Sequence, residues 1–198
     1  LQSINLSPAL LNRYLKDRPL PDAQLAPLGR LTLTGFIKGN TQQLKVNRLA
    51  LRSQSYTAFY GRIEASQLLS TDQLRFTLLI DSLRTQPSDL RGFLNDTIPG
   101  PMAALGESLY QGTIAGSLTD FELDGILQTQ AGSALHDVQI QFSDKFKGAD
   151  YKGELQLNGI ALNQLLNNPD LGQLSLQVRG EGHGLTLDSI EATLDGTV

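Results

Sequence analysis

The sequence contains no cysteine, which excludes structural disulfides and thiolate metal sites. It also lacks the run of about 18 apolar residues that a membrane-spanning helix requires. Residues 1–20 have neither the charged start nor the apolar middle of a signal peptide. Because the chain opens within one pattern and stops inside LDGTV, which reads like a strand, we expect an excerpt of a longer protein. The absence of a signal peptide and of a membrane-spanning helix then does not indicate where the longer protein, which we call the parent, resides.

Concentrated positive charge is missing as well. The net charge is −4 and the pI is about 5.1, and the longest basic stretch, residues 16–18, itself includes an acid. This excludes the electrostatic footprint of a nucleic-acid-binding protein and a polybasic membrane patch. With 40% apolar and 18% charged residues, the 198-residue chain is expected to fold, as one core or as one slice of an elongated architecture.

Residues for catalysis are equally scarce. The two histidines, His136 and His183, have no partners at metal-ligand or triad spacing, and no GxGxxG, GxSxG, P-loop or HExxH motif occurs. The acids Asp120, Glu122 and Asp124 leave open a glycosidase with two carboxylates, but their i, i+2 spacing favours the solvated face of a strand. We therefore expect no enzyme, no metal and no cofactor.

What the chain does contain is strand-like alternation with short turns, which is typical of an antiparallel meander. Turns are predicted at 39–40, 130–133, 143–149 and 180–184. Three segments have helical spacing instead, SPALLNRYL (7–15), PSDLRGFL (87–94) and ALNQLLNN (161–168). Strands are predicted at 31–37, 44–51, 56–65, 73–82, 112–118, 121–128, 135–142, 151–158, 173–180 and 185–194.

Similar phrases recur along the chain. LGRLTLTGFIKGN begins at residue 28, LYQGTIAGSLTD at 109 and LGQLSLQVRGEGHG at 171, at unequal intervals of 81 and 62 residues. This spacing is too irregular for a strict solenoid but fits a repeated supersecondary unit with variable hairpins. We therefore interpret residues 1–198 as a single segment of an elongated repeat structure.

Leucine and glycine indicate the shape of the sheet. The chain has 38 leucines but 4 valines, although packed strands prefer β-branched residues. Either a fluid apolar partner of the strands or a plain compositional bias would explain this excess of leucine. Glycines inside strands are typical of bends, and several of them would curl the sheet into a trough. The predicted fold is mainly β, a long antiparallel meander curled into a half-pipe, or β-taco, with a few short helices.

The apolar positions of the strands are expected to share one face of this sheet. That face either lines a groove or is closed by the protein itself in a β-sandwich, an adhesin-like structural module without a ligand. The candidate groove residues are Leu31, Leu33, Ile37, Leu44, Val46, Leu74, Phe76, Leu78, Ile80, Phe121, Leu123, Leu127, Val138, Ile140, Phe142, Leu155, Leu157, Leu174, Leu176 and Val178.

These phrases resemble a known family. INLSPALLNRYL, LGRLTLTGFIKGNTQQLKVNRLALRS and above all GHGLTLDSIEATLDGTV resemble the AsmA-like superfamily, specifically the TamB family of translocation and assembly module components in its Bacteroidota form. The resemblance implies a sheet folded lengthwise into an apolar trough, within a Gram-negative protein that is anchored in the inner membrane and crosses the periplasm. It implies phospholipid acyl chains as cargo, assembly or secretion of outer-membrane β proteins, and a BamA-type insertase as partner of the full-length parent. Membrane contact is then expected only through parts of the parent outside this segment.

Overall fold

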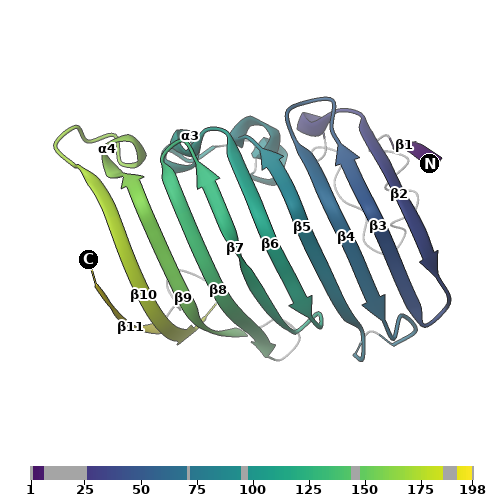
Figure 1. Cartoon of the computed structure of the whole chain (residues 1–198). Coiled ribbons are helices and arrows are strands. Elements are labelled where there is room, and N and C mark those ends of the chain that lie inside the picture. Colours follow the sequence, from purple (N-terminus) through teal and green to yellow (C-terminus); the bar gives the residue numbers. More distant parts are fainter. Residues whose placement is uncertain are drawn as a thin grey trace.

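The described residues form one open antiparallel sheet. The computed structural model (Figure 1) describes residues 2–6, 26–70, 72–94, 98–143, 148–184 and 191–197. All eleven strands of these residues belong to a single sheet, in which each strand pairs with its neighbours in the sequence. The strands are β1 (Gln2–Leu6), β2 (Leu31–Gly39), β3 (Gln43–Arg52), β4 (Ala58–Ser66), β5 (Arg75–Thr85), β6 (Ser108–Gly116), β7 (Asp120–Thr129), β8 (Gly132–Ser143), β9 (Gly148–Ala161), β10 (Gln173–His183) and β11 (Glu191–Thr197).

This topology confirms the predicted fold class. The two chain ends lie at opposite ends of the sheet, and β1 and β11 are its edge strands, so the described strands do not close into a barrel. Those strands also form no second sheet. Register shifts interrupt five of the strand pairs, for example between Val46 and Leu49 of β3. Such β-bulges bend a strand and increase its twist, which curves the sheet.

The predicted strands fall on β2–β11, but several bounds differ, and β5, β8, β9 and β11 extend three residues beyond a predicted end. β6 begins at Ser108, four residues before the predicted start at 112. The predicted turn at 180–184 is wrong, because β10 continues to His183 and pairs there with β9 and β11. In this stretch glycine alternates with Glu181 and His183, so the two-residue period of a strand is kept. Part of the last predicted strand, residues 185–190, lies outside the described residues.

The helical segments differ from the prediction in type or in length. Residues 87–94 form a 3₁₀ helix, η2 (Pro87–Leu94), rather than an α-helix, and the segment 161–168 contains one α-helical turn, α4 (Leu162–Leu165). The predicted helix at 7–15 lies outside the described residues. Two further elements were not predicted, η1 (Ala26–Leu28) and α3 (Gly100–Leu105). Each spans six residues or fewer, too short for helical periodicity to be recognised.

These helices gather at one end of the strands (Figure 1). There η1 contacts η2, and α3 contacts both η2 and α4, whereas α4 alone makes a substantial contact with a strand, its neighbour β10. The described helices therefore pack mainly against one another. We call this end the helical rim, and the opposite end, with the turns at 40–42, 67–70 and 72–74, and 117–119, the turn rim.

Asp89 holds the helical rim together. Its side chain is 2% exposed, and its Oδ2 accepts hydrogen bonds from Ser55 Oγ, from the backbone nitrogens of Tyr56 and Thr57, and from Thr57 Oγ1. Gln86 Nε2 donates to the other oxygen at 3.0 Å. A buried carboxylate requires such partners, so η2 is tied to the connection between β3 and β4.

The recurring sequence phrases occupy equivalent places. They fall on the starts of β2, β6 and β10, which are four strands apart in the sheet. Each of these strands begins at the helical rim, directly after a connection that contains η1, α3 or α4. The intervals of 81 and 62 residues between the phrases are unequal, but each interval spans four strands. We refer to β2–β5 as the first unit and to β6–β9 as the second unit.

Candidate functional site

One face of the sheet is apolar along almost its whole length. Residues directly opposite each other in neighbouring strands share a face, so the pairing registers define rows of side chains that run across the strands. Four such rows cross this face. The first runs Ile37, Val46, Ile63, Leu78, Ile114, Leu123 and Val138; the second Leu33, Leu51, Phe59, Leu83, Tyr110, Leu127, Ala134, Leu157 and Leu176; the third Leu44, Ala65, Phe76, Gly116, Phe121, Ile140 and Tyr151; the fourth Leu49, Gly61, Ile80, Gly112, Gly125, His136, Leu155 and Val178.

The structure brings nearly all predicted groove residues onto this apolar face. Leu31 and Leu174 lie at the strand ends nearest the helical rim, and Phe142 at the end nearest the turn rim. Leu74 is the exception, because it precedes β5 and lies outside the sheet. Whether these residues bind lipid stays a prediction.

Several members of this face were not on the predicted list. Phe59, Ile63 and Ile114 alternate with glycine or alanine, which weakens the apolar pattern that identifies a core face. Leu49 and Leu83 follow the bulges in β3 and β5, where the alternation changes phase. A search for alternation that counts glycine as apolar would have found the first group.

The apolar face is only partly buried. Leu31, Val46 and Ile80 are 4%, 7% and 6% exposed, but most of the other described side chains on this face have intermediate exposure. No large side chain of the described residues is completely buried. The described residues therefore contain no deep, closed core of the kind that two packed layers produce.

Glycines in the fourth row make room for aromatic rings from the second row. A Cβ atom added to Gly61 would lie 2.9 Å from Phe59, and one added to Gly125 would lie 2.6 Å from Tyr110 Oη. The Tyr110 ring stacks on His136, and Tyr110 Oη is buried without a hydrogen-bond partner among the described residues. Burial, and in second place the negative charge of Asp124, raises the pKa of this hydroxyl above its usual value of 10.0.

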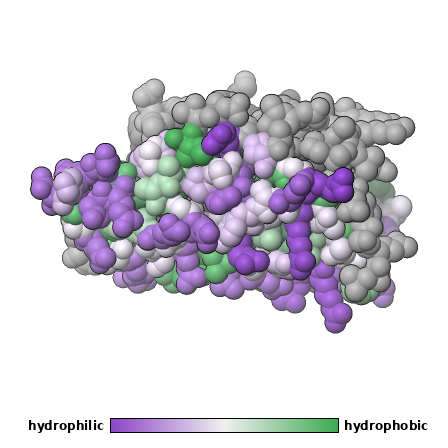
Figure 2. Space-filling model, turned by 90° about the horizontal axis from the view of Figure 1, so that it is seen from above, coloured by the Kyte–Doolittle hydropathy of each residue, from purple (hydrophilic) through white to green (hydrophobic). Residues whose placement is uncertain are grey.

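The opposite face is polar. Hydrophilic residues project along one side of the molecule when it is seen from the helical rim (Figure 2). Asp120, Glu122 and Asp124 are all exposed on this face, as their spacing predicts. His136 lies on the apolar face and His183 at the end of β10, so the structure brings neither histidine into a cluster with these acids.

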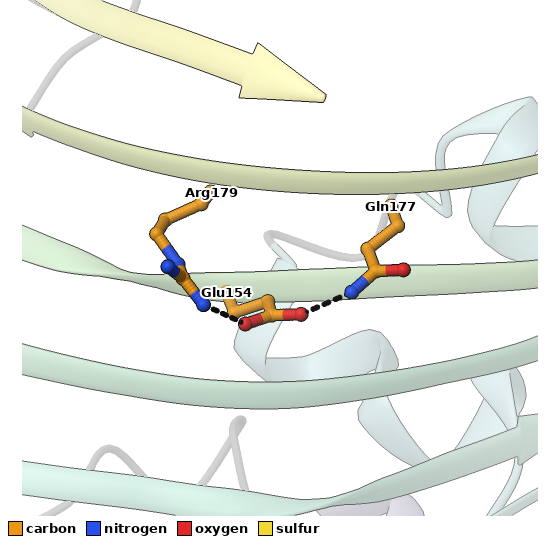
Figure 3. Close-up of polar contacts among 3 residues, drawn as sticks. All are labelled: Glu154, Gln177 and Arg179. Atoms are coloured by element: carbon orange, nitrogen blue, oxygen red, sulfur yellow. Dashed lines mark hydrogen bonds and ion pairs between the residues drawn. The ribbon is translucent and has the colours of Figure 1, made fainter. Parts of the chain in front are cut away.

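A small polar network joins β9 and β10 on this face (Figure 3). Arg179 Nη2 donates to Glu154 Oε2 at 2.9 Å, and Gln177 Nε2 donates to Glu154 Oε1. The hydrogen bond from Arg179, and then that from Gln177, lowers the pKa of Glu154 below its usual 4.5. The network is exposed, so its role is to orient side chains rather than to contribute much stability.

Neither metal ligands nor a membrane span stand out in the described part of the chain. Its His, Asp and Glu side chains form no group of three or more that could hold a metal ion. None of its helices has the length and apolar content that crossing a membrane requires.

Comparison of the chain with protein-family models, with curated proteins and with solved structures finds no match. The family resemblance therefore stays a prediction.

Proposed function

We propose that this chain is a segment of a periplasmic conduit, in which the apolar face lines a groove for phospholipid acyl chains. The observation that supports the proposal is the continuity of the apolar rows, two of which run from β2 or β3 to β10 without a charged side chain. A soluble protein rarely leaves so long an apolar surface only partly covered unless that surface meets an apolar partner.

The energetics favour such a surface. Moving an acyl chain through water costs about 0.8 kcal/mol per methylene, or on the order of 12 kcal/mol for a sixteen-carbon tail. The longest row crosses nine strands, and at about 4.8 Å between strands it offers a continuous apolar path of about 38 Å. An acyl chain on this path keeps apolar contacts while its headgroup stays in water, so no specific polar contact is needed.

The family resemblance adds the biological setting of the proposal. The parent would be anchored in the inner membrane of a Gram-negative bacterium and would reach a BamA-type insertase at the outer membrane. Its cargo would be phospholipid, and the same apolar face would suit outer-membrane β proteins in transit. This chain would contribute the apolar path and no enzymatic step.

Site-specific photocrosslinking to lipid in cells tests the proposal. Leu176 and Gln177 are neighbours in β10 that point to opposite faces, and so are Leu123 and Glu122 in β7. A photoreactive residue at Leu176 or Leu123 is expected to capture phospholipid, whereas the matched probes at Gln177 and Glu122 serve as controls. Equal labelling of both faces, or phospholipid absent from all four probes, would contradict the groove.

A second test uses charge in place of a probe. Leu176→Asp is expected to block lipid transport by the parent while the segment stays folded, because the side chain then meets lipid rather than a packed core. Gln177→Asp is the matched control and should leave transport unchanged. If Leu176→Asp instead unfolds the segment, as burial of an unpaired charge in a closed interior predicts, the apolar face is filled by protein and the proposal fails.

A further inference from the structure

The polar face is divided into two oppositely charged regions. The strands of the first unit contain seven Lys or Arg and two Asp or Glu residues, a net charge of +5. The strands of the second unit contain one Lys and six Asp or Glu residues, a net charge of −5. The acidic net charge of the whole chain, −4, conceals this division. An anionic partner is therefore attracted to one end of the sheet and repelled from the other.

A pocket lies within the basic region, at the turn rim. Its volume is about 760 Å³, and its polar lining includes Lys38, Gln43, Lys45, Glu64, Ser66 and Arg75. Three cations and one acid give this lining a net charge of +2. The cations are distant in the sequence and come from β2, β3 and β5. The lack of a basic run therefore does not exclude a basic patch, contrary to the inference from the sequence, because the fold brings these residues together.

The cations of this pocket are incompletely neutralised. Lys38 lies directly opposite Lys45, an arrangement of like charges that destabilises a sheet. Glu64 forms an ion pair with Lys45. Within the described part of the chain, neither Lys38 nor Arg75 forms an ion pair. An external anion at this position would relieve the repulsion.

Exposed aliphatic side chains adjoin the same pocket. Ile37, the neighbour of Lys38 in β2 that points to the apolar face, is 70% exposed, and Leu69, in the turn between β4 and β5, is 80% exposed. The backbone nitrogen of Leu68 donates to the carbonyl of Gln42 at 3.5 Å, which places this turn beside the turn between β2 and β3. The turn rim thus presents protruding aliphatic residues beside unneutralised cations.

We propose that this part of the turn rim binds the surface of an anionic phospholipid bilayer. Lys38 and Arg75 contact lipid phosphates, and Leu69 and Ile37 enter the boundary between headgroups and acyl chains. Both contacts are needed, because aliphatic insertion and attraction to anionic lipid together produce stable binding at an interface. A soluble anion satisfies the cations alone and leaves Leu69 in water. The inference goes beyond the conduit and does not depend on it, and it gives this segment a membrane contact of its own.

Vesicle co-sedimentation tests the proposal. The chain is expected to bind vesicles of phosphatidylcholine mixed with phosphatidylglycerol, to bind pure phosphatidylcholine vesicles much more weakly, and to lose binding as salt is raised. Lys38→Glu combined with Arg75→Glu should weaken binding by about 30-fold or more, since each cation near an anionic surface contributes about 1 kcal/mol. Arg52→Glu combined with Arg84→Glu changes the net charge equally at the helical-rim ends of β3 and β5 and is the matched control.

The aliphatic contact has its own pair of variants. Leu69→Ser should weaken vesicle binding, and Leu166→Ser, which removes an exposed leucine at the opposite rim, should not. The proposal is overturned if anionic vesicles do not bind, if the control variants lose as much affinity as the test variants, or if inorganic phosphate binds the pocket while vesicles do not. All six substituted positions are exposed, and the salt dependence of the unmodified chain gives a readout that needs no variant. Vesicle binding without acyl crosslinking would uphold this contact and reject the conduit.

Discussion

The Tyr110 ring stacks on the imidazole of His136, with 5.5 Å between the ring centroids and 6° between the ring planes. The two residues come from β6 and β8, and they meet because Gly125 of the intervening β7 has no side chain to separate them. Aromatic packing is thus achieved between strands that are not neighbours. The arrangement leaves Tyr110 Oη buried without a hydrogen-bond partner among the described residues.

Tyr110→Phe is therefore expected to stabilise the chain by about 1 kcal/mol, because it removes a buried hydroxyl that makes no hydrogen bond and keeps the ring. The free energy of unfolding in urea measures this change. Tyr60→Phe is the control, since the Tyr60 hydroxyl accepts a hydrogen bond from Arg52 Nε at 2.8 Å on the exposed face. Removal of that hydroxyl should change stability little and should not stabilise. A loss of stability in Tyr110→Phe would mean that the hydroxyl has a partner.

Gly125→Ala should destabilise the chain by about 2 kcal/mol or more. The new methyl group would lie 2.6 Å from both Tyr110 Oη and the carbonyl oxygen of Gln111, which is too close for any carbon atom, and overpacking of this kind costs about 1–3 kcal/mol. Gly172→Ala is the matched control, because nothing lies within 4 Å of the added carbon. Thermal unfolding of the two variants compares them. An unchanged melting temperature in Gly125→Ala would show that the rings do not occupy this space.

Asp89→Ala should cost about 3 kcal/mol at neutral pH, since five donors lose a charged acceptor. Burial acts to raise the pKa of Asp89, but hydrogen bonds from Gln86, Thr57 and Ser55 outweigh it and hold the pKa below 3.8. The contribution is therefore complete above the unfolded pKa of about 3.8 and is lost as pH falls through the lower folded pKa. Urea unfolding at about pH 7 and about pH 3 should show a smaller difference between wild type and variant at the acidic pH. Asp72→Ala, in an exposed turn, should change stability by less than about 0.5 kcal/mol.

Asp137→Asn should stabilise the chain by a few tenths of a kcal/mol at low salt. Asp137 lies directly opposite Asp124 on one side and Glu154 on the other, so three carboxylates stand in one row. Like charges opposite each other destabilise a sheet by roughly 0.2–1 kcal/mol. Asp150→Asn is the control, because its opposite neighbours are Gln141 and His183. The gain from Asp137→Asn should shrink when salt is added, and a gain that is independent of salt would reject the electrostatic explanation.

The alternation of apolar and polar residues was enough to predict the strands and most of the apolar face. This prediction succeeds because nearly every strand has one face in solvent, so apolar and polar residues alternate along it with a period of two. It fails at the bulges, where an extra residue such as Arg48, with a φ of 51°, moves Leu49 and Leu51 out of phase. It also fails at Gly180 and Gly182, where glycine stands in for apolar side chains and resembles a turn.

The basic pocket and the Asp89 cluster were beyond the reach of sequence reasoning for a different reason. Both depend on which residues come to lie opposite each other, as Lys38 and Lys45 do, or on long-range contacts such as that between Asp89 and Thr57. Local patterns carry no information about such contacts. They follow only when the register of each strand pair and the packing of the helical rim are known.

The four-strand spacing of β2, β6 and β10 limits how this architecture can change in length. Because four is even, each unit returns the chain to the rim from which it started, with the same strand direction. Duplication or deletion of one complete unit would alter the span by about 19 Å and leave every remaining residue on its original side. Gain or loss of a single strand would instead deliver the chain to the wrong rim. The length of the sheet can therefore change in steps of one four-strand unit. Duplication of a unit lengthens the sheet, and the strands already present need no change in sequence or orientation.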